Sequence, residues 1–249
     1  MKIHTNEVII AKRKKQAGIV TTVALVALAG GLVVNFISTS REVINPLYIW
    51  ATITLLAVGF IAATISSNMV NHWVKEPRPD QFFVKALKGL DNRYVLFNYT
   101  SAIPHVLLSQ NTIYALMPKL TDGEISVTER KWRRKFKASR LLRFFGEEGL
   151  GNPTVEAEHQ QQKLTQLVHN NITNGDDLTI ETLIIFTDPN AQLTLENPTM
   201  PVVPGKQLKK YLRQESQAAE INREQRQQLI ALLQGPETET KAKNQVAEA

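Results

Sequence analysis

The 249-residue chain contains no cysteine. This absence excludes disulfide bonds and thiolate metal sites, so a bound metal ion would need oxygen or imidazole ligands. Nothing in the composition conflicts with a reducing compartment. The length accommodates one anchor and one domain of about 130 residues, which is within the usual size of a folding unit.

Charged residues are missing from two long stretches near the N-terminus. The first runs from Gly18 to Ile37, and at about 1.5 Å per residue it is long enough to cross a hydrocarbon core of about 30 Å. The second runs from Leu47 to Val70, with Tyr48, Trp50 and Trp73 near its ends, where a membrane interface favours amphipathic rings. We therefore predict two transmembrane helices, at residues 18–37 and 47–70.

Basic residues flank this pair of stretches on the outside. Residues 12–15 precede the first stretch, Lys75, Arg78, Lys85 and Lys88 follow the second, and only Arg41 lies between them. This bias predicts a multi-pass cell-membrane protein whose basic N-terminus (residues 1–17), soluble domain and C-terminus are cytoplasmic. A cleaved signal peptide is the alternative for the first stretch, although its apolar run exceeds the usual 7 to 15 residues or so.

The rest of the chain alternates between helical and strand-like patterns. Asp80 suits the N-cap or first turn of a helix over Gln81–Leu90, where apolar residues recur at helical spacing. Short polar breaks then separate three strand-like runs, which predict an antiparallel meander: Tyr94–Tyr99, Ile103–Leu108 and Thr112–Met117. A Gln-rich helix over Glu156–His169 and an apolar central strand over Leu178–Phe186 follow, so the expected fold class is α/β with a mixed sheet.

Several pieces of sequence occur in the order and spacing of one known family. They are Ile103–Leu108, Ile113–Lys119 followed by Gly123 and Trp132, Gly151–Pro153, Ile184–Asp188 and Leu208–Leu212. Over residues 80–213 the chain thus resembles the nuclease-related domain (NERD) family, a branch of the restriction-endonuclease-like fold with a PD-(D/E)xK active site. The resemblance implies an α-β-β-β-α-β core and metal-dependent hydrolysis of phosphodiesters.

The residues that the resemblance assigns to catalysis are incomplete. Lys119 matches the motif lysine, but Met117 stands at the Glu position and Pro104, before the retained His105, at the Asp position. A thioether and an imino acid cannot bind Mg²⁺, which requires carboxylate oxygens. Asp80 stands where the family usually has a first-helix Glu. Lys119 and Asp80 are therefore expected to be residual positions of an inactive site without a metal cofactor.

Other readings of these positions stay open. Three carboxylates follow shortly after Lys119 and would allow a displaced Mg²⁺ site in an active nuclease: Asp122, Glu124 and Glu129. The pair Asp122-Gly123 also fits a turn. His105 is either a metal ligand or a packed core histidine. Lys119 is either a phosphate contact or a solvated lysine at the strand end. Asp80 is either a metal ligand or a helix cap.

The strongest charge feature lies in residues 130–143, in a chain with a net charge of +6. The candidate binding residues are Arg130, Lys131, Trp132, Arg133, Arg134, Lys135, Lys137, Arg140 and Arg143. Basic side chains neutralise phosphates and aromatic rings stack on unpaired bases, so nucleic acid is one predicted ligand. An anionic membrane surface is the other, at about 1 kcal/mol per basic residue near the headgroups, and a solvated loop is the third possibility.

The C-terminal region is polar and rich in Gln and Glu. Residues 214–234 favour a helix with a thin apolar stripe that would dock on the domain or pair with a partner protein: Ile221, Leu229, Leu232 and Leu233. Residues 235–249 are expected to be disordered. The sequence thus predicts a membrane-anchored NERD-like protein without nuclease activity that binds nucleic acid or anionic lipid. An active nuclease and a scaffolding module are the alternatives.

Overall fold

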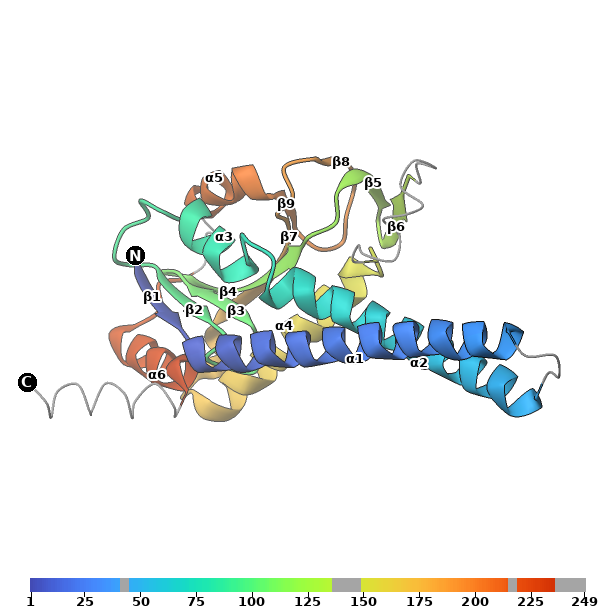
Figure 1. Ribbon diagram of the computed structural model, residues 1–249. Coiled ribbons are helices and arrows are strands. Elements are labelled where there is room, and N and C mark those ends of the chain that lie inside the picture. Colours follow the sequence, from blue (N-terminus) through green and yellow to red (C-terminus); the bar gives the residue numbers. More distant parts are fainter. Residues whose placement is uncertain (41–44, 136–148, 215–218, 236–249) are drawn as a thin grey trace, which may run out of the picture. The chain divides into compact units, whose positions relative to one another are not determined.

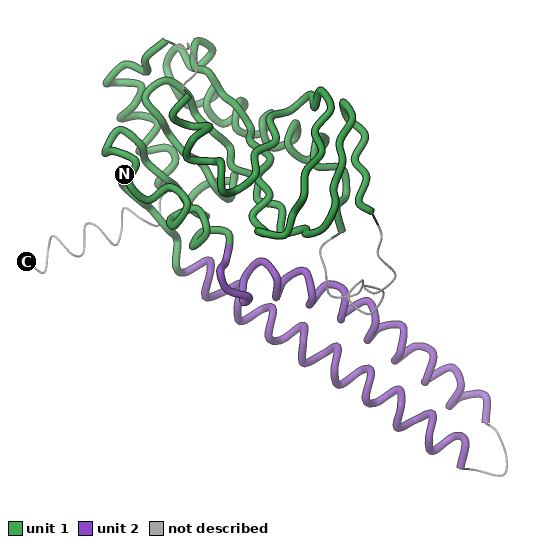
Figure 2. Tube along the Cα trace, turned by 90° about the horizontal axis from the view of Figure 1, so that it is seen from above, with its two compact units in different colours: residues 1–7, 79–136, 149–249 green, residues 8–78, 137–148 purple. Residues whose placement is uncertain are grey.

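The computed structural model describes residues 1–40, 45–135, 149–214 and 219–235. The chain divides into two compact units, which Figure 2 distinguishes by colour. Residues 1–7 belong to the α/β unit together with the described residues from Pro79 onward, whereas residues 8–78 form a helical hairpin. The first few residues of the chain are therefore part of the α/β domain.

The hairpin consists of α1 (Glu7–Thr39) and α2 (Pro46–Trp73). Asn45 caps α2, since its side-chain oxygen accepts a hydrogen bond from the Leu47 amide at 2.9 Å, and Pro46 occupies the first turn. The predicted basic segment 1–17 is not a separate extension. No helix breaker lies between Glu7 and the apolar stretch, so most of that segment is the first part of α1.

Small side chains form the contact between the two helices. Ala17, Ala24 and Gly31 are buried at seven-residue intervals in α1, and Thr52, Gly59 and Ser66 repeat at the same interval in α2. This is the period of two helices packed along a shallow crossing. Small residues at the contact allow the close backbone approach that is common in membrane helices.

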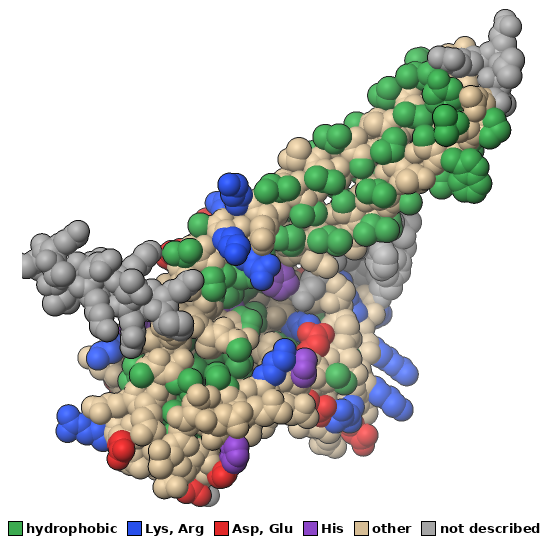
Figure 3. All heavy atoms as spheres, turned by 90° about the horizontal axis from the view of Figure 1, so that it is seen from below, with side chains coloured by type: hydrophobic (Ala, Val, Ile, Leu, Met, Phe, Trp, Pro, Cys, Tyr) green, Lys and Arg blue, Asp and Glu red, His purple; other side chains and the backbone are tan. Residues whose placement is uncertain are grey.

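Large apolar side chains cover the outside of the hairpin (Figure 3). The outward residues include Val26, Phe36, Trp50, Phe60 and Ile61. Only 22% and 11% of the most apolar windows of α1 and α2 are buried, which is unlike the core helix of a soluble domain. Both helices are long and apolar enough to cross a membrane.

A six-stranded mixed sheet forms the centre of the α/β unit (Figure 1), in the order β1-β2-β3-β4-β7-β9. Its strands are β1 (Lys2–Thr5), β2 (Val95–Asn98), β3 (His105–Leu108), β4 (Thr112–Lys119), β7 (Thr179–Phe186) and β9 (Val202–Pro204). Strands β2, β3 and β4 pair antiparallel in sequence order, which confirms the predicted meander. Strand β7 pairs parallel with β4 and β9 inside the sheet, as its apolar run predicted.

Helices cover both faces of this sheet. Helices α3 (Pro79–Ala86) and α5 (Leu208–Arg213) contribute Phe83 and Leu208 to the core on one face. Helices α4 (Pro153–Asn171) and α6 (Arg223–Gln234) contribute Leu164 and Leu229 on the other. Single-turn helices η2 (Gly175–Asp177) and η3 (Gly205–Gln207) join elements. The predicted α/β class with a mixed sheet is confirmed. The predicted order of helix, three strands, helix and strand occurs as α3, β2 to β4, α4 and β7, but β5 and β6 are inserted before α4. The restriction-endonuclease fold itself stays a prediction.

A second, three-stranded sheet was not predicted. It has the order β6-β5-β8 and consists of β5 (Gly123–Thr128), β6 (Lys131–Arg134) and β8 (Ala191–Glu196). These strands are short and half-exposed, so their apolar pattern is weak. Gly123 opens β5 with a φ of 88°, a left-handed conformation that glycine tolerates.

The C-terminal helix α6 packs on the domain. It begins at Arg223 rather than at residue 214, because Asn222 caps it by accepting a hydrogen bond from the Gln225 amide at 2.8 Å. Its residues Leu229 and Leu233 are fully buried against the face that carries α4. Docking on the domain, one of the two predicted roles of the stripe, is therefore observed. The predicted disordered tail, from residue 236 onward, lies outside the described residues.

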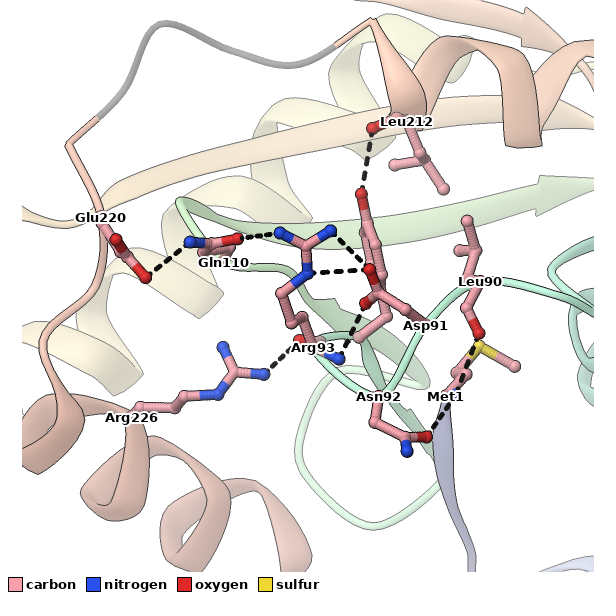
Figure 4. A network of polar contacts seen from close by, with 10 residues as sticks. Met1, Leu90, Asp91, Asn92, Arg93, Gln110, Leu212, Glu220 and Arg226 are labelled. Carbon is pink, nitrogen blue, oxygen red and sulfur yellow. Dashed lines mark hydrogen bonds and ion pairs between the residues drawn. The ribbon is translucent and has the colours of Figure 1, made fainter.

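A polar network fastens this C-terminal region to the first strands of the domain (Figure 4). The guanidinium of Arg226 donates to the Ser109 carbonyl at 2.6 Å and to the Arg93 carbonyl. The Gln110 amide donates to Glu220 at 2.5 Å, and its oxygen accepts from Arg93 at 2.8 Å. The chain after residue 218 is thus held at two points.

Candidate functional site

Lys119, the residual motif lysine, is buried at the end of β4. Only 3% of its side chain is exposed, and its Nζ donates to Oε2 of Glu156 at 2.7 Å. Alternate residues of β4 face α4, and Glu156 lies in the first turn of that helix, which Asn152 caps. Lys119 is therefore an ion-paired lysine and not a solvated one.

The position where the family has a motif glutamate is part of the apolar core. Met117 is buried on the same side of β4 as Lys119 and packs with Ala157, Ile184 and Phe186. Pro104 is exposed just before β3, and its carbonyl accepts a hydrogen bond from the Tyr99 amide at 2.6 Å. Neither residue offers a carboxylate to a metal ion.

The remaining histidine of the motif region is a packed core residue. The ring of His105 lies 5.0 Å from the ring of Phe83 and 4.7 Å from that of Tyr99, measured between centroids. Its Nδ1 lies 2.9 Å from the side-chain oxygen of Asn98. Asp80 is buried in the first turn of α3, which is the placement that its sequence context predicted. His105 points to the α3 side of the sheet, whereas Lys119 points to the α4 side.

Two of the three carboxylates that follow Lys119 in the sequence contact basic residues of β6 and its end. Asp122 accepts a hydrogen bond from Arg134 at 2.5 Å, and Glu124 one from Lys135 at 2.9 Å. Among the residues that the structure describes, no group of three or more histidine, aspartate or glutamate side chains is arranged to hold a metal ion.

Part of the basic segment is neutralised within the domain. Arg130 binds Glu158 through both of its terminal nitrogens. This contact raises the pKa of Arg130 and lowers that of Glu158, in each case chiefly through the hydrogen bonds between them. Arg134 and Lys135 have the carboxylate partners described above. Three of the predicted ligand-binding cations are thus already paired with acids.

Two basic side chains of the segment remain exposed on the outer face of the small sheet. Lys131 and Arg133 alternate along β6, beside Thr128 and Ser126 of β5. Within the described ranges neither side chain has a hydrogen bond or ion pair. Three other predicted binding residues lie outside the described residues: Lys137, Arg140 and Arg143. The described part of the basic surface is therefore the pair Lys131 and Arg133.

Trp132 does not lie on that surface, although the sequence predicted it as a ligand-binding residue. It alternates with the two exposed cations and turns inward, where its ring lies 5.9 Å from that of Phe186. Its indole nitrogen donates to the Thr154 hydroxyl at 2.8 Å. Trp132 is half-buried and packs against the core, so it does not lie beside the two exposed cations. Ligand binding by Trp132 stays a prediction.

Sequence reasoning also missed Glu156, the partner of Lys119. The order of elements along the chain could have indicated this partner. Helix α4 lies between the parallel strands β4 and β7, so its first turn lies near the end of β4. An acidic residue in that first turn, after the capping Asn152, was the candidate partner for a lysine at the strand end.

The comparison with known proteins supplies no relative. The chain matches no model of a protein family, no curated protein and no solved structure. The relationship to the NERD family therefore stays a prediction that depends on the motif residues alone.

Proposed function

We propose that this protein is a membrane-anchored, NERD-like domain that binds anionic lipid headgroups through its basic segment and does not cleave nucleic acid. The observation that carries the proposal is the exposed pair Lys131 and Arg133, in a domain joined to two membrane-length helices. Basic residues near anionic headgroups contribute about 1 kcal/mol each.

The hairpin supports the anchoring. Its bulky side chains face outward and its small ones inward, as expected where lipid is the solvent. Cleavage after α1 as a signal peptide would remove β1 from the central sheet, which argues against that alternative. Because β1 and the domain that follows α2 share one sheet, both ends of the hairpin belong on the same side. The basic residues outside the spans favour the cytoplasm for that side.

Lipid is favoured over nucleic acid for two reasons. A domain anchored in a bilayer meets the headgroups at a high effective concentration, so even a small basic surface is occupied. In addition, Trp132 packs against the core and donates a hydrogen bond to Thr154, so it does not offer a stacking surface beside Lys131 and Arg133. Salt-sensitive binding to phosphates is common to both ligands, and the experiment below separates them.

Loss of cleavage is supported by the surroundings of Lys119. Met117 packs among apolar side chains, and Lys119 donates to Glu156. A scaffolding role through the C-terminal helix has less support, since Leu229 and Leu233 are buried in the domain.

The test uses the full-length protein in lipid nanodiscs. Because the chain has no cysteine, Ser126→Cys carries a single fluorescent probe beside Arg133. We expect the probe to report lipid contact in anionic discs and not in zwitterionic ones. Lys131→Glu with Arg133→Glu should weaken that contact by at least thirtyfold, since two residues contribute about 2 kcal/mol.

The matched control reverses two exposed lysines elsewhere, Lys163→Glu with Lys206→Glu, and changes the net charge equally. Equal loss in both double variants would refute a local binding surface. The protein in zwitterionic discs could instead bind single-stranded DNA or RNA tightly and lose this binding with Lys131→Glu and Arg133→Glu. That result would identify nucleic acid, and not lipid, as the ligand. Cleavage of DNA or RNA in the presence of Mg²⁺ or Mn²⁺, if Lys119→Ala abolishes it, would overturn the proposal that the protein does not cleave nucleic acid.

A further inference from the structure

The edge strand β1 pairs with a strand that is distant in the sequence. It runs parallel to β2, with Lys2 opposite Val95 and Thr5 opposite Asn98, although both hairpin helices lie between them in the chain. The Lys2 amide donates to the Tyr94 carbonyl at 3.0 Å. The amide of the residue after β1 donates to the Asn98 carbonyl, also at 3.0 Å.

Side chains reinforce this pairing. The His4 ring stacks on Phe97, with centroids 5.3 Å apart and planes inclined by 14°. The side-chain nitrogen of Asn98 donates to the Thr5 hydroxyl at 3.2 Å. Without β1, the outer main-chain groups of β2 would become an open sheet edge.

The chain connections between the hairpin and the sheet are short. Asn6 alone separates the end of β1 from the start of α1, and residues 74–78 separate α2 from α3. An extended chain covers at most about 3.5 Å per residue, so these connections provide little slack. The position of β1 is therefore linked to that of α1, and the start of the domain to the end of α2.

Within the hairpin, the helices are held together by contacts without spare volume. A Cβ atom at Gly59 would lie 2.7 Å from Leu28 Cγ and 3.0 Å from the Leu28 amide nitrogen. Midway along the helices, the hydroxyls of Thr21 and Ser66 lie 2.6 Å apart and share a hydrogen bond. A Cβ at Gly18, by contrast, would meet nothing within 4 Å.

We infer that β1 is a coupling strand, which completes the central sheet only while α1 and α2 are packed as a hairpin. Separation of the helices moves α1 and withdraws β1 from β2, so the state of the membrane segment changes the edge of the domain. The inference concerns regulation of the domain and is independent of which ligand the basic segment binds.

Disulfide trapping in the full-length protein in its membrane tests the coupling, because the chain is free of cysteine. Thr5→Cys with Asn98→Cys reports the pairing of β1, and Thr21→Cys with Ser66→Cys reports the packing of the helices. Each pair is combined with Gly59→Leu, which forces bulk into the helix contact, or with Gly18→Leu, which adds the same bulk where there is space.

We expect Gly59→Leu to lower both cross-linking yields at least threefold and Gly18→Leu to leave both unchanged. A fall at positions 21 and 66 with no fall at positions 5 and 98 would overturn the coupling. So would unchanged yields at both pairs in Gly59→Leu, because the inference requires a tight glycine contact. An equal fall in Gly18→Leu would likewise overturn it, since bulk alone would then be the cause.

Discussion

The Nζ of Lys119 lies 2.7 Å from Oε2 of Glu156 and connects the end of β4 to the first turn of α4. The two partners differ in environment: the lysine is 3% exposed and the glutamate 47%. The burial of the cation therefore dominates the energetics of the pair, because the glutamate is largely screened by solvent.

Glu156→Gln is expected to destabilise the domain, because the buried ammonium loses its carboxylate partner. We expect a loss of about 1 to 2 kcal/mol in the free energy of unfolding, less than for a fully buried pair. Lys119→Met should cost less, since an apolar side chain of similar length suits a buried position. Denaturant unfolding of the two single variants and of the double variant measures the coupling between Lys119 and Glu156. Additive changes in the free energy of unfolding would contradict this coupling.

Thr182→Val is expected to stabilise the domain. Its hydroxyl is buried in β7 without a hydrogen-bond partner among the described residues, and valine preserves the shape. Removal of an unsatisfied polar group should contribute about 1 kcal/mol. The matched control is Thr100→Val, which should destabilise, because the Thr100 hydroxyl donates to the Leu233 carbonyl at 2.6 Å. Thermal unfolding of both variants measures the two effects. Equal shifts in the melting temperature would refute the difference between the unsatisfied Thr182 hydroxyl and the hydrogen-bonded Thr100 hydroxyl.

The stability of the domain is expected to fall above about pH 10 because of Tyr211. Burial, followed by the charge of Glu181 and the hydrogen bond to it at 3.0 Å, raises the pKa of Tyr211. A raised pKa means that the folded state keeps the phenol proton after the unfolded state has lost it. The stabilising contribution is complete below the unfolded pKa near 10 and declines as the pH rises toward the folded pKa.

Tyr211→Phe should remove this part of the alkaline dependence and should also lower stability at neutral pH, through loss of the hydrogen bond. Unfolding free energies measured between pH 8 and pH 11 or so for both proteins provide the check. An unchanged slope above pH 10 in Tyr211→Phe would show that another group is responsible.

Arg226→Ala is expected to loosen α6. The guanidinium bridges the carbonyls of Ser109 and Arg93, and alanine leaves both without this donor. Figure 4 shows the contact with Arg93. Charged hydrogen bonds of this kind contribute about 1.5 to 3 kcal/mol each. Amide hydrogen exchange should accelerate in α6 relative to the central sheet. Arg223→Ala, at an exposed position of the same helix, is the control and should leave the exchange unchanged.

Much of the architecture was predictable because it depends on local patterns. The missing charges in residues 18–37 and 47–70 predicted two helices of membrane length, and α1 and α2 contain those stretches. Apolar periodicity predicted the meander and the interior strand β7. The seven-residue spacing of small residues was also legible, although it becomes meaningful only once α1 and α2 face each other.

The identity of single residues determined one part of the site outright. The side chains of Met117 and Pro104 carry no carboxylate in any fold, so the absence of carboxylate ligands at these motif positions follows from the sequence by itself. Which partners the polar residues take was decided only by the tertiary structure. Glu156 reaches Lys119 through a strand-to-helix crossover, and the alternation of β6 turns Trp132 inward while Lys131 and Arg133 point outward.

The pairing of β1 with β2 depended most completely on the tertiary structure. Four residues before a long helix have no local pattern that specifies a strand, and their partners lie beyond both helices. The strand forms because the hairpin returns the chain to its starting side and the edge of β2 offers unpaired main-chain groups. The sequence alone determined which segments are apolar and which motif carboxylates are missing, while long-range pairing decided which residues meet.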